Sequence, residues 1–320
     1  MGTARGYKSE CVLDFETTFG EDPASPAGLI MPLNTMGVRS QRNKTTPATI
    51  RGNRNPAAPF DGNLSVSGGI QAPVDTIATG HWLRAMFGVP ATTGSDPYTH
   101  TFTVGDTQPS LVLEKKFADT AAAIKYAKYN GCKIASWSMS VGGDGELVQD
   151  FDVAGADETL ADAAYDSSAS SVSIDRLNNF QASLTEGGSP LTIATDVDFT
   201  IDFGLDTDKY VIGGSGTLGD IPEGIIGVSG NLTALFQNDT LLNKAVNSTE
   251  SSLVITLTDG DYSLVITFEE LQYSRNTPGI EGPQGVLITL PFTGYFDDGA
   301  SSSAITAALT NAQAGSVYGG

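Results

Sequence analysis

Residues 62–72 read Gly-Asn-Leu-Ser-Val-Ser-Gly-Gly-Ile-Gln-Ala, and residues 224–234 read Gly-Ile-Ile-Gly-Val-Ser-Gly-Asn-Leu-Thr-Ala. Both stretches contain Val-Ser-Gly at the same place and alternate in character, which predicts a β-strand with one buried face. The two stretches begin 162 positions apart (224 − 62). This self-similarity indicates that the chain contains two copies of one strand-rich unit.

Further matches follow the same order in both halves. Asp14-Phe-Glu-Thr-Thr-Phe-Gly-Glu-Asp22 is identical to Asp198-Phe-Thr-Ile-Asp-Phe-Gly-Leu-Asp206 at five of nine positions. Downstream of the repeated strand, each half has a short helical pattern, expected over Asp75–Phe87 and Asp239–Val246. An aspartate lies near the expected N-cap of each helix, which strengthens the prediction.

Two hairpins are then expected in each half. Residues 99–104 are expected to pair with 110–117, and residues 253–257 with 263–268; each return strand begins with Ser-Leu-Val. Residues 133–141 are expected to pair with 146–153, and residues 286–296 with 304–310. Gly and Asp between these strands, such as Gly142-Gly-Asp-Gly145 and Asp297-Asp-Gly299, supply the backbone angles of hairpin turns.

The order strand, strand, helix, hairpin, hairpin therefore occurs twice. A chain of 320 residues is long enough for about two domains. We expect a mostly β protein of two tandem antiparallel β-sandwich or barrel domains, each with one flanking α-helix. The predicted domains are residues 1–160 and 172–320, joined by an Ala- and Ser-rich linker over residues 161–171.

Composition limits the possible partners. Thirty-seven acidic and 17 basic residues give a net charge of −20, which repels polyanions and disfavours ordinary phosphate binding. The two cysteines, Cys11 and Cys132, are expected to be free thiols of a reducing compartment. No secretion signal or membrane span is recognised, so synthesis in the cytoplasm and no membrane partner are expected.

No pattern supports a catalytic, metal or cofactor site. The two histidines, His81 and His100, lie in different predicted elements, whereas zinc sites need three or four clustered ligands. Gly214-Ser-Gly-Thr-Leu-Gly219 has the letters of a dinucleotide fingerprint, but Pro222 follows and no βαβ unit opens there. Because no convergent acid, base, nucleophile or metal set is found, the protein is predicted not to be an enzyme.

Several motifs resemble one known family. Glu16-Thr-Thr-Phe-Gly20, the basic segment Arg39–Arg54, residues 62–68 and Tyr98-Thr-His-Thr-Phe102 resemble the N-terminal half of tail tube proteins of long-tailed phages. The stretches Glu223-Gly-Ile-Ile-Gly-Val-Ser-Gly-Asn-Leu-Thr-Ala-Leu-Phe236 and Gly282-Pro-Gln-Gly-Val-Leu-Ile-Thr-Leu-Pro-Phe-Thr-Gly-Tyr-Phe296 resemble the C-terminal half. The resemblance covers most of the chain in the right order.

This resemblance implies a virion protein whose rings stack into a hollow tube through which genome DNA passes without specific binding. With two copies of the domain in each chain, three chains would close a ring of pseudo-sixfold symmetry. The implied partners are the chain itself and tail terminator, tape measure and baseplate proteins. The implied location is the phage tail, after synthesis in the host cytoplasm. Open sheet edges would let sheets continue from domain to domain around the ring.

Positive charge is concentrated in one segment. Five of the 17 basic residues fall within residues 39–54: Arg39, Arg42, Lys44, Arg51 and Arg54. The segment 39–55 has no apolar periodicity and contains Pro47, which predicts a long loop. We hypothesise that this loop contacts an acidic surface of a neighbouring subunit or ring. The alternative is a solvated loop without a partner.

Other functions are compatible with the same sequence features. A tail terminator, a baseplate hub or a decoration protein would use a related fold but would cap or dock instead of polymerising. The tube of a bacterial secretion machine shares the fold, although its subunits usually carry one domain. A tandem β-sandwich binding module is a further alternative, although no exposed aromatic platform is evident.

Overall fold

The computed structural model describes residues 3–118, 120–122, 124–280, 282–296, 299 and 302–319. Strands dominate these residues, which confirms the expected mostly β fold. The strands of the first 160 residues are β1 (Cys11–Phe15), β2 (Leu29–Ile30), β3 (Thr35–Met36), β4 (Arg39–Thr45), β5 (Phe60–Pro73), β6 (Ala91–Gly94), β7 (Tyr98–Thr103), β8 (Leu111–Lys116), β9 (Tyr126–Gly142), β10 (Val148–Gly155) and β11 (Asp157–Ala161).

The later strands are β12 (Ser170–Ser171), β13 (Ala182–Glu186), β14 (Ser189–Pro190), β15 (Ala194–Asp202), β16 (Gly227–Leu235), β17 (Ser251–Asp259), β18 (Tyr262–Tyr273), β19 (Leu287–Tyr295) and β20 (Thr306–Asn311). The α-helices are α1 (Ala78–Phe87), α2 (Thr240–Val246) and α3 (Gly315–Gly319), and short 3-10 helices cover Gly6–Lys8 and Asn179–Gln181. Helices α1 and α2 confirm the two helices predicted from the sequence.

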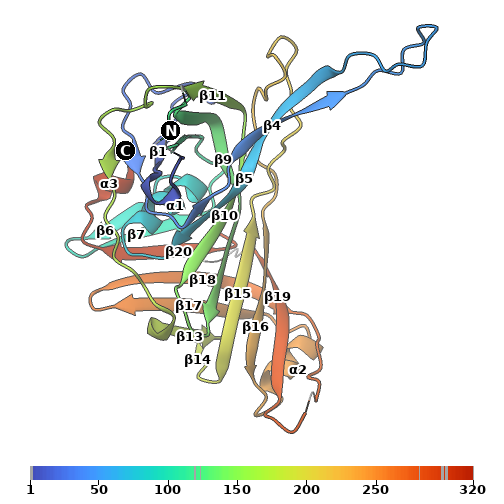
Figure 1. Ribbon diagram of the computed structural model, residues 1–320. Helices are drawn as coiled ribbons and strands as arrows, with labels where there is room; N and C mark the ends of the chain where they lie inside the picture. The colour runs from blue at the N-terminus through green and yellow to red at the C-terminus, as the bar shows by residue number, and fades with distance from the viewer. Residues whose placement is uncertain are drawn as a thin grey trace.

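A large antiparallel sheet runs through the middle of the molecule (Figure 1). Its strands pair in the order β4–β5–β10–β9–β15–β16–β19, and residues 270–273 of β18 pair with β19 at the far end. We call this the central sheet. It joins the two halves of the chain, because β9 of the first half pairs with β15 of the second along seven residues, Asp202↔Ser136 to Asp196↔Gly142.

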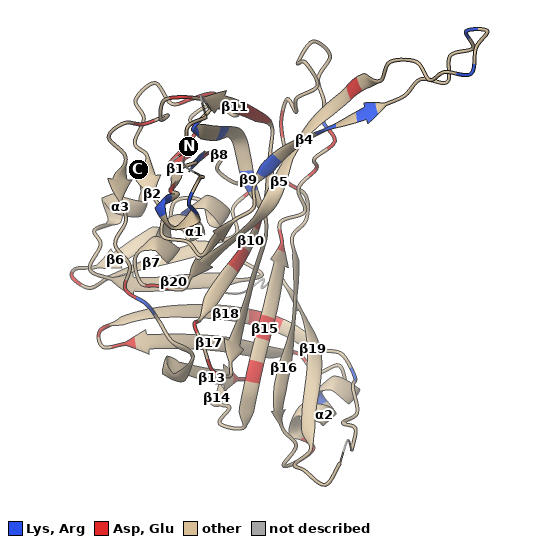
Figure 2. Ribbon diagram, in the orientation of Figure 1, with Lys and Arg blue, Asp and Glu red and all other residues tan. Residues whose placement is uncertain are grey.

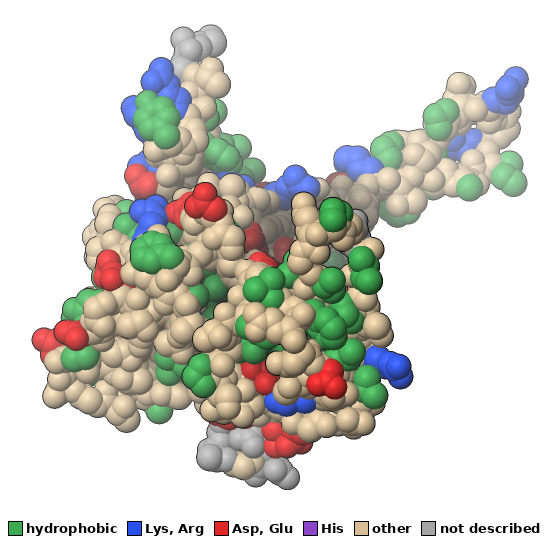
Figure 3. All heavy atoms as spheres, turned by 90° about the horizontal axis from the view of Figure 1, so that it is seen from below, with side chains coloured by type: hydrophobic (Ala, Val, Ile, Leu, Met, Phe, Trp, Pro, Cys, Tyr) green, Lys and Arg blue, Asp and Glu red, His purple; other side chains and the backbone are tan. Residues whose placement is uncertain are grey.

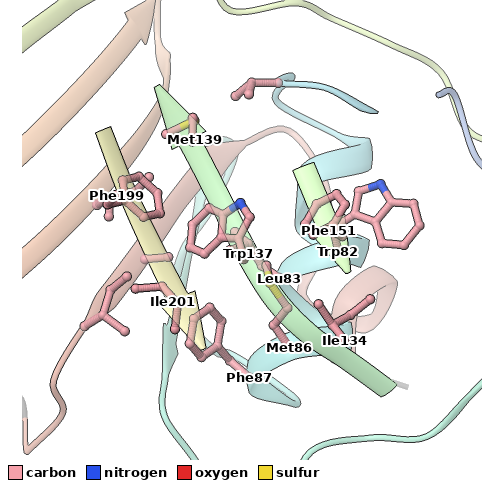
Figure 4. Packing of buried hydrophobic residues seen from close by; sticks show 14 of the residues in the cluster. Trp82, Leu83, Met86, Phe87, Ile134, Trp137, Met139, Phe151, Phe199 and Ile201 are labelled. Carbon is pink, nitrogen blue, oxygen red and sulfur yellow. The ribbon is translucent and has the colours of Figure 1, made fainter. Parts of the chain in front are cut away.

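One face of the central sheet is packed into the core. Trp137 on β9 and Phe199 on β15 point into this core with ring centroids 5.0 Å apart, and helix α1 adds Trp82, whose ring stacks on Phe151 of β10 at 4.8 Å (Figure 4). Phe87 at the end of α1 makes an edge contact with Trp137 at 6.2 Å. Each of these rings is buried, so burial of aromatic surface is a large stabilising contribution here.

Two smaller sets of strands extend from the central sheet. In the first half, the pairing order is β2–β1–β8–β9–β11, with β12 parallel to β2. The other set has the order β14–β13–β17–β18–β20–β7–β6 and so combines strands of the second half with β6 and β7 of the first. The long strands β9 and β18 each belong both to one of these sets and to the central sheet.

The glycine of the repeated Val-Ser-Gly motif is required by close packing in both halves. A Cβ on Gly68 of β5 would lie 2.4 Å from the carbonyl oxygen of Gly37, and one on Gly230 of β16 would lie 2.2 Å from that of Asp198. Both positions therefore exclude any side chain, because the backbone of a neighbouring segment passes too close.

Two of the four predicted hairpins are correct. Strands β9 and β10 pair across the turn at Gly142–Gly145, and β17 pairs with β18. The hairpin predicted between residues 99–104 and 110–117 is wrong, because β7 pairs with β6 and β20 whereas β8 pairs with β1 and β9. The shared Ser-Leu-Val therefore does not mark equivalent strands.

The hairpin predicted between residues 286–296 and 304–310 is also wrong. Strands β19 and β20 both pair with β18, at residues 270–273 and 263–267 respectively. Residues 297 and 298 of its predicted turn lie outside the described residues. A strand can pair with a strand that is distant in the sequence when that position buries more apolar surface, and local turn signals do not reveal this.

The basic segment is not a loop along its whole length. Residues 39–45 form β4, which pairs with β5, so the prediction of a loop over residues 39–55 is wrong for this part. The sequence predicts a loop because the segment has no apolar periodicity. Strand β4 is nearly all exposed, so it has no apolar face that could produce such a periodicity. The predicted linker, residues 161–171, includes the short strand β12. The division into two domains stays a prediction.

Candidate functional site

The side of the central sheet away from the core carries short polar side chains. Alternation places Trp137 and Met139 of β9 in the core and Ser136, Ser138 and Ser140 on the opposite side. We call this side the open face and define it by these residues: Gln71, Ser136, Ser138, Ser140, Asp150, Asp152, Asp196, Asp198, Thr200, Asp202, Ser229, Asn231, Thr233, Thr289 and Thr293.

The open face is acidic. It holds the aspartates of β10 and β15, whereas Arg39 is a basic side chain on the same side of the sheet, at the edge strand β4 opposite Ser67. Figure 2 shows these acidic positions along β10 and β15. On β15 the sequence Asp-Val-Asp-Phe-Thr-Ile-Asp over residues 196–202 alternates acidic or polar side chains with apolar ones. This alternation is visible in the sequence and indicates a strand with one acidic face, although no site is predicted from it.

Hydrogen bonds between neighbouring strands hold several open-face carboxylates. Gln71 Nε2 donates to Asp150 Oδ1 at 2.9 Å, and Asn231 Nδ2 donates to Asp198 Oδ1 at 3.0 Å. Each acceptor lies directly across the ladder from its donor. Such contacts keep the side chains close to the sheet, so the open face is a broad polar wall with fixed negative charge.

A long arm projects from one end of the central sheet (Figure 1). It consists of the outer parts of β4 and β5 and the connection between them, and we define it as residues 41–63. None of these residues is buried. Ile50 near its tip is 98% exposed, which is unfavourable for an isoleucine in water. The arm therefore has the character of a contact element rather than of a core element.

The five basic residues predicted as a contact lie on β4 and along the arm. Arg39, Arg42 and Lys44 are on β4, whereas Arg51 and Arg54 lie in the connection beyond it. All five are exposed. They are spread along the arm and do not form one cluster. Whether they touch another subunit stays a prediction.

Several of these side chains have partners within the chain. Lys44 Nζ lies 2.5 Å from Asp61 Oδ1 on the facing strand. Arg42 Nη2 donates to the carbonyl oxygen of Ser215 at 3.1 Å, and Arg51 Nη2 donates to that of Pro56 at 3.0 Å. The pKa of Asp61 is lowered by its hydrogen bond with Lys44.

The connection between β15 and β16, residues 203–226, lies beside the base of the arm. The backbone N–H of Leu64 donates to the carbonyl oxygen of Gly216 at 2.8 Å. A mostly buried ion pair fixes the other end: Lys133 Nζ lies 2.7 Å from Glu223 Oε1 and donates to the carbonyl oxygen of Ile221 at 2.8 Å. Sequence reasoning missed this pair, since nothing in local spacing joins residues so far apart.

Both histidines are buried inside the fold. His81 is buried in α1, and burial lowers its pKa to about 4. His100 on β7 is buried against Tyr318, with ring centroids 4.8 Å apart. Among the residues that the structure describes, no group of three or more His, Cys, Asp or Glu side chains is placed to hold a metal ion. Within the same residues, no helix is both long and apolar enough to cross a membrane.

The fold and these surfaces together define an antiparallel β-sheet protein that presents a wide acidic wall and a projecting basic arm. The phage tail tube protein family matches this chain over residues 6–294. The chain therefore belongs to the phage tail tube protein family, which confirms the resemblance found in its motifs. No curated protein matches the chain.

Membership of this family makes the chain a structural component of the phage tail, in a family without enzymatic activity. It also implies that the chain assembles with itself into a tube and associates with other tail components.

Proposed function

We propose that this chain is the major subunit of the tail tube and that its open face lines the channel through which genome DNA moves. The observation that carries the proposal is the acidic excess on the open face, where the aspartates of β10 and β15 outnumber Arg39, which lies on the same side at the edge strand β4, opposite Ser67. Each contact between a phosphate and a basic side chain adds affinity through counterion release. A wall with an excess of negative groups repels DNA and lets it slide.

We further propose that three chains form a ring of pseudo-sixfold symmetry. The strand order supports this: β4–β5–β10–β9 is followed in the same sheet by β15–β16–β19–β18, with α1 and α2 at the same point of the chain order. Each half thus contributes the same arrangement of four strands to the wall. This repetition also supports the duplication inferred from the sequence.

The arm is proposed to contact the next ring. It leaves the molecule at one end, and exposed apolar residues lie at the opposite end, where β16 ends and β19 begins (Figures 1 and 3): Leu235, Phe236 and Leu287. Opposite ends meet when rings stack in one direction. Such a contact would bury the exposed isoleucine of the arm and the exposed apolar residues at the opposite end, which stabilises the stack.

Electron microscopy of the purified protein at raised concentration tests the proposal. Hollow tubes with a regular axial repeat are expected, and mass analysis of isolated rings should give three chains. Rings of six chains would overturn the trimer while leaving the tube intact. Caps or isolated rings that never stack, even with tail extracts added as an initiator, would favour a terminator or a baseplate component.

A further inference from the structure

The pairing of β9 with β15, where the two halves of the central sheet meet, predicts how two chains join. Strand β9 is the last strand of the first four, and β15 is the first strand of the second four. They pair antiparallel, with Asp202 opposite Ser136 and Thr200 opposite Ser138. If the same four-strand unit repeats around a ring, the last strand of one chain meets the first strand of the next in the same manner.

The repeat holds at the level of individual strand pairs. The ladder β8–β9 shifts register between Leu111↔Cys132 and Leu113↔Tyr129. The ladder β17–β18 shifts in the same manner between Ser251↔Leu271 and Leu253↔Phe268. In both, two residues on the first strand oppose three on the second. Residues of β9 thus correspond to residues of β18 that lie 139 positions later (271 − 132 and 268 − 129).

Strand β18, which would pair with the next chain, has an edge without a described partner beyond Leu271. On β9, the side that carries β8 up to Cys132 carries β15 from Ser136 onward. On β18, the side that carries β17 ends at Leu271, and no described strand continues along it. The chain nevertheless stays extended against β19, because the N–H of Ser274 donates to the carbonyl oxygen of Pro291 at 2.7 Å. Residues 272–276 therefore form an open edge.

The opposite edge of the central sheet is formed by β3 and β4. Their inner sides pair with β5, as in Thr35↔Gln71 and Arg39↔Ser67, and no described strand pairs with their outer sides. The 162-residue offset makes Gln41, opposite Ser65, the counterpart of Asp202, opposite Gly227 (227 − 65). Through the same offset, Ser274 beside Pro291 is the counterpart of Ser136 beside Asp152 (231 − 69 for their partners on β16 and β5). The spacing between β9 and β18 falls from 139 to 138 here because the β9–β10 ladder shifts register between Ile134 and Ser136.

We propose that residues 272–276 of one chain pair antiparallel with β4 of the next chain, with Ser274 opposite Gln41 and Asn276 opposite Arg39. This interface rests on the proposed tube function and gives it a specific register. It is a head-to-tail contact between two different edges of identical chains, which closes into a ring. It also pairs the backbone groups of both open edges, which would otherwise promote unspecific aggregation.

Charge favours the same neighbour. Beyond Gln41, β4 carries Arg42 opposite Tyr273 and Lys44 toward Leu271 of the next chain, where β17 meets β18. Glu269 and Glu270 make this end of the second edge acidic. A basic edge therefore meets an acidic one, which gives the contact a direction and disfavours pairing of like edges.

Disulfide trapping in assembled tubes tests the register. The variant Gln41→Cys/Ser274→Cys should form covalent dimers and closed trimers on mild oxidation, because directly opposed residues have the separation a disulfide needs. Arg39→Cys/Asn276→Cys should do the same. The matched control, Gln41→Cys/Gln272→Cys, moves one thiol two residues along the same edge and should cross-link at least tenfold less. The native Cys11 and Cys132 are buried.

Amide hydrogen exchange on the unmodified protein provides a second readout that does not depend on cysteine variants. Assembly should slow exchange in residues 39–43 and 272–276. Tubes that form without trapping in either pair, or without protection of these two edges, would overturn the interface while leaving the tube function standing. Failure of the unmodified protein to form rings or tubes at all would instead count against the proposed function.

Discussion

The ammonium group of Lys133 on β9 lies 2.7 Å from the carboxylate of Glu223, 90 positions later in the chain (223 − 133). Only 8% of the Lys133 side chain and 23% of the Glu223 side chain are exposed. Glu223 Oε1 also accepts the backbone N–H of Gln108 at 2.8 Å. One carboxylate thus ties together three segments: β9, the segment before β8 and the connection between β15 and β16.

Removing the charge of Lys133 should loosen this connection. Lys133→Met leaves Glu223 without its counter-charge in a mostly buried position, and we expect a loss of about 2 kcal/mol in the free energy of unfolding, measured by chemical denaturation. Exchange of the amides of residues 205–221 should accelerate. Lys209, whose side chain is paired with Asp206 in the same connection but is 56% exposed, supplies the control: Lys209→Met should change neither readout. Equal effects of both variants would contradict the role assigned to Lys133.

Tyr318 should act as an anchor for the C-terminal segment. Its buried ring contacts His81 and His100, and its hydroxyl donates to the carbonyl oxygen of Ile77 at 2.8 Å and accepts from Asn311 Nδ2 at 3.0 Å. Tyr318→Ala should cost about 4 kcal/mol of unfolding free energy through the cavity it leaves. Tyr318→Phe should cost about 1 kcal/mol, since it removes only the hydroxyl. Denaturation curves in which the two variants coincide would argue against ring packing as the main contribution.

Asp75 should make stability depend on pH. Burial raises the pKa of Asp75 from 3.8 to about 6, although its carboxylate accepts backbone N–H groups at the start of α1. Between about pH 4 and 6 the folded chain retains a proton that the unfolded chain releases, so this group lowers stability as pH rises. Asp75→Asn should therefore gain stability relative to the unmodified protein by up to about 3 kcal/mol from pH 4 to pH 7.

The comparison uses the difference between the two proteins at each pH. Burial lowers the pKa of His81 to about 4, and this gives a slope of opposite sign, which is common to both proteins and cancels. A difference that stays constant from pH 4 to pH 7 would contradict the prediction for Asp75.

Basic residues on the open face should convert the wall into a DNA-binding surface. In tubes of Ser138→Lys/Thr200→Lys, two positions directly opposite on β9 and β15 gain positive charge. These tubes should retain duplex DNA in a salt-dependent manner, measured by co-sedimentation, whereas unmodified tubes should not. Thr192→Lys/Thr258→Lys, at exposed positions outside the central sheet, controls for net charge. Equal retention by both variants would mean that the open face does not line the channel.

Charge reversal near the tip of the arm should weaken stacking of rings. Arg51→Glu/Arg54→Glu should shorten tubes in electron micrographs without changing the unfolding curve, because both side chains are exposed. Raised salt should shorten unmodified tubes as well. Thr258→Glu, at an exposed position of β17 outside the arm, is a control for added negative charge elsewhere on the chain. Unchanged tube length in the double variant would remove the arm from the proposed contact.

Local patterns predicted the elements that depend on local chemistry. Alternation in residues 62–72 and 224–234 gave β5 and β16, and the aspartate-preceded apolar patterns gave α1 and α2. Partners were predicted correctly only where a tight turn dictates them, as at Gly142–Gly145. The basic charge of the arm was also visible, but its strand β4 was not, because an exposed strand has no apolar face to reveal it.

The sequence by itself thus determined the β-rich class, the repeated motif, the acidic balance and the family resemblance, since these follow from composition and short-range spacing. Only the tertiary structure decided that β9 joins β15, that β19 and β20 pair with different parts of β18 and that Lys133 meets Glu223. The physical reason is that strand partners and buried ion pairs are chosen by burial and backbone pairing across the whole molecule. Residues far apart in the chain carry no local mark of that choice.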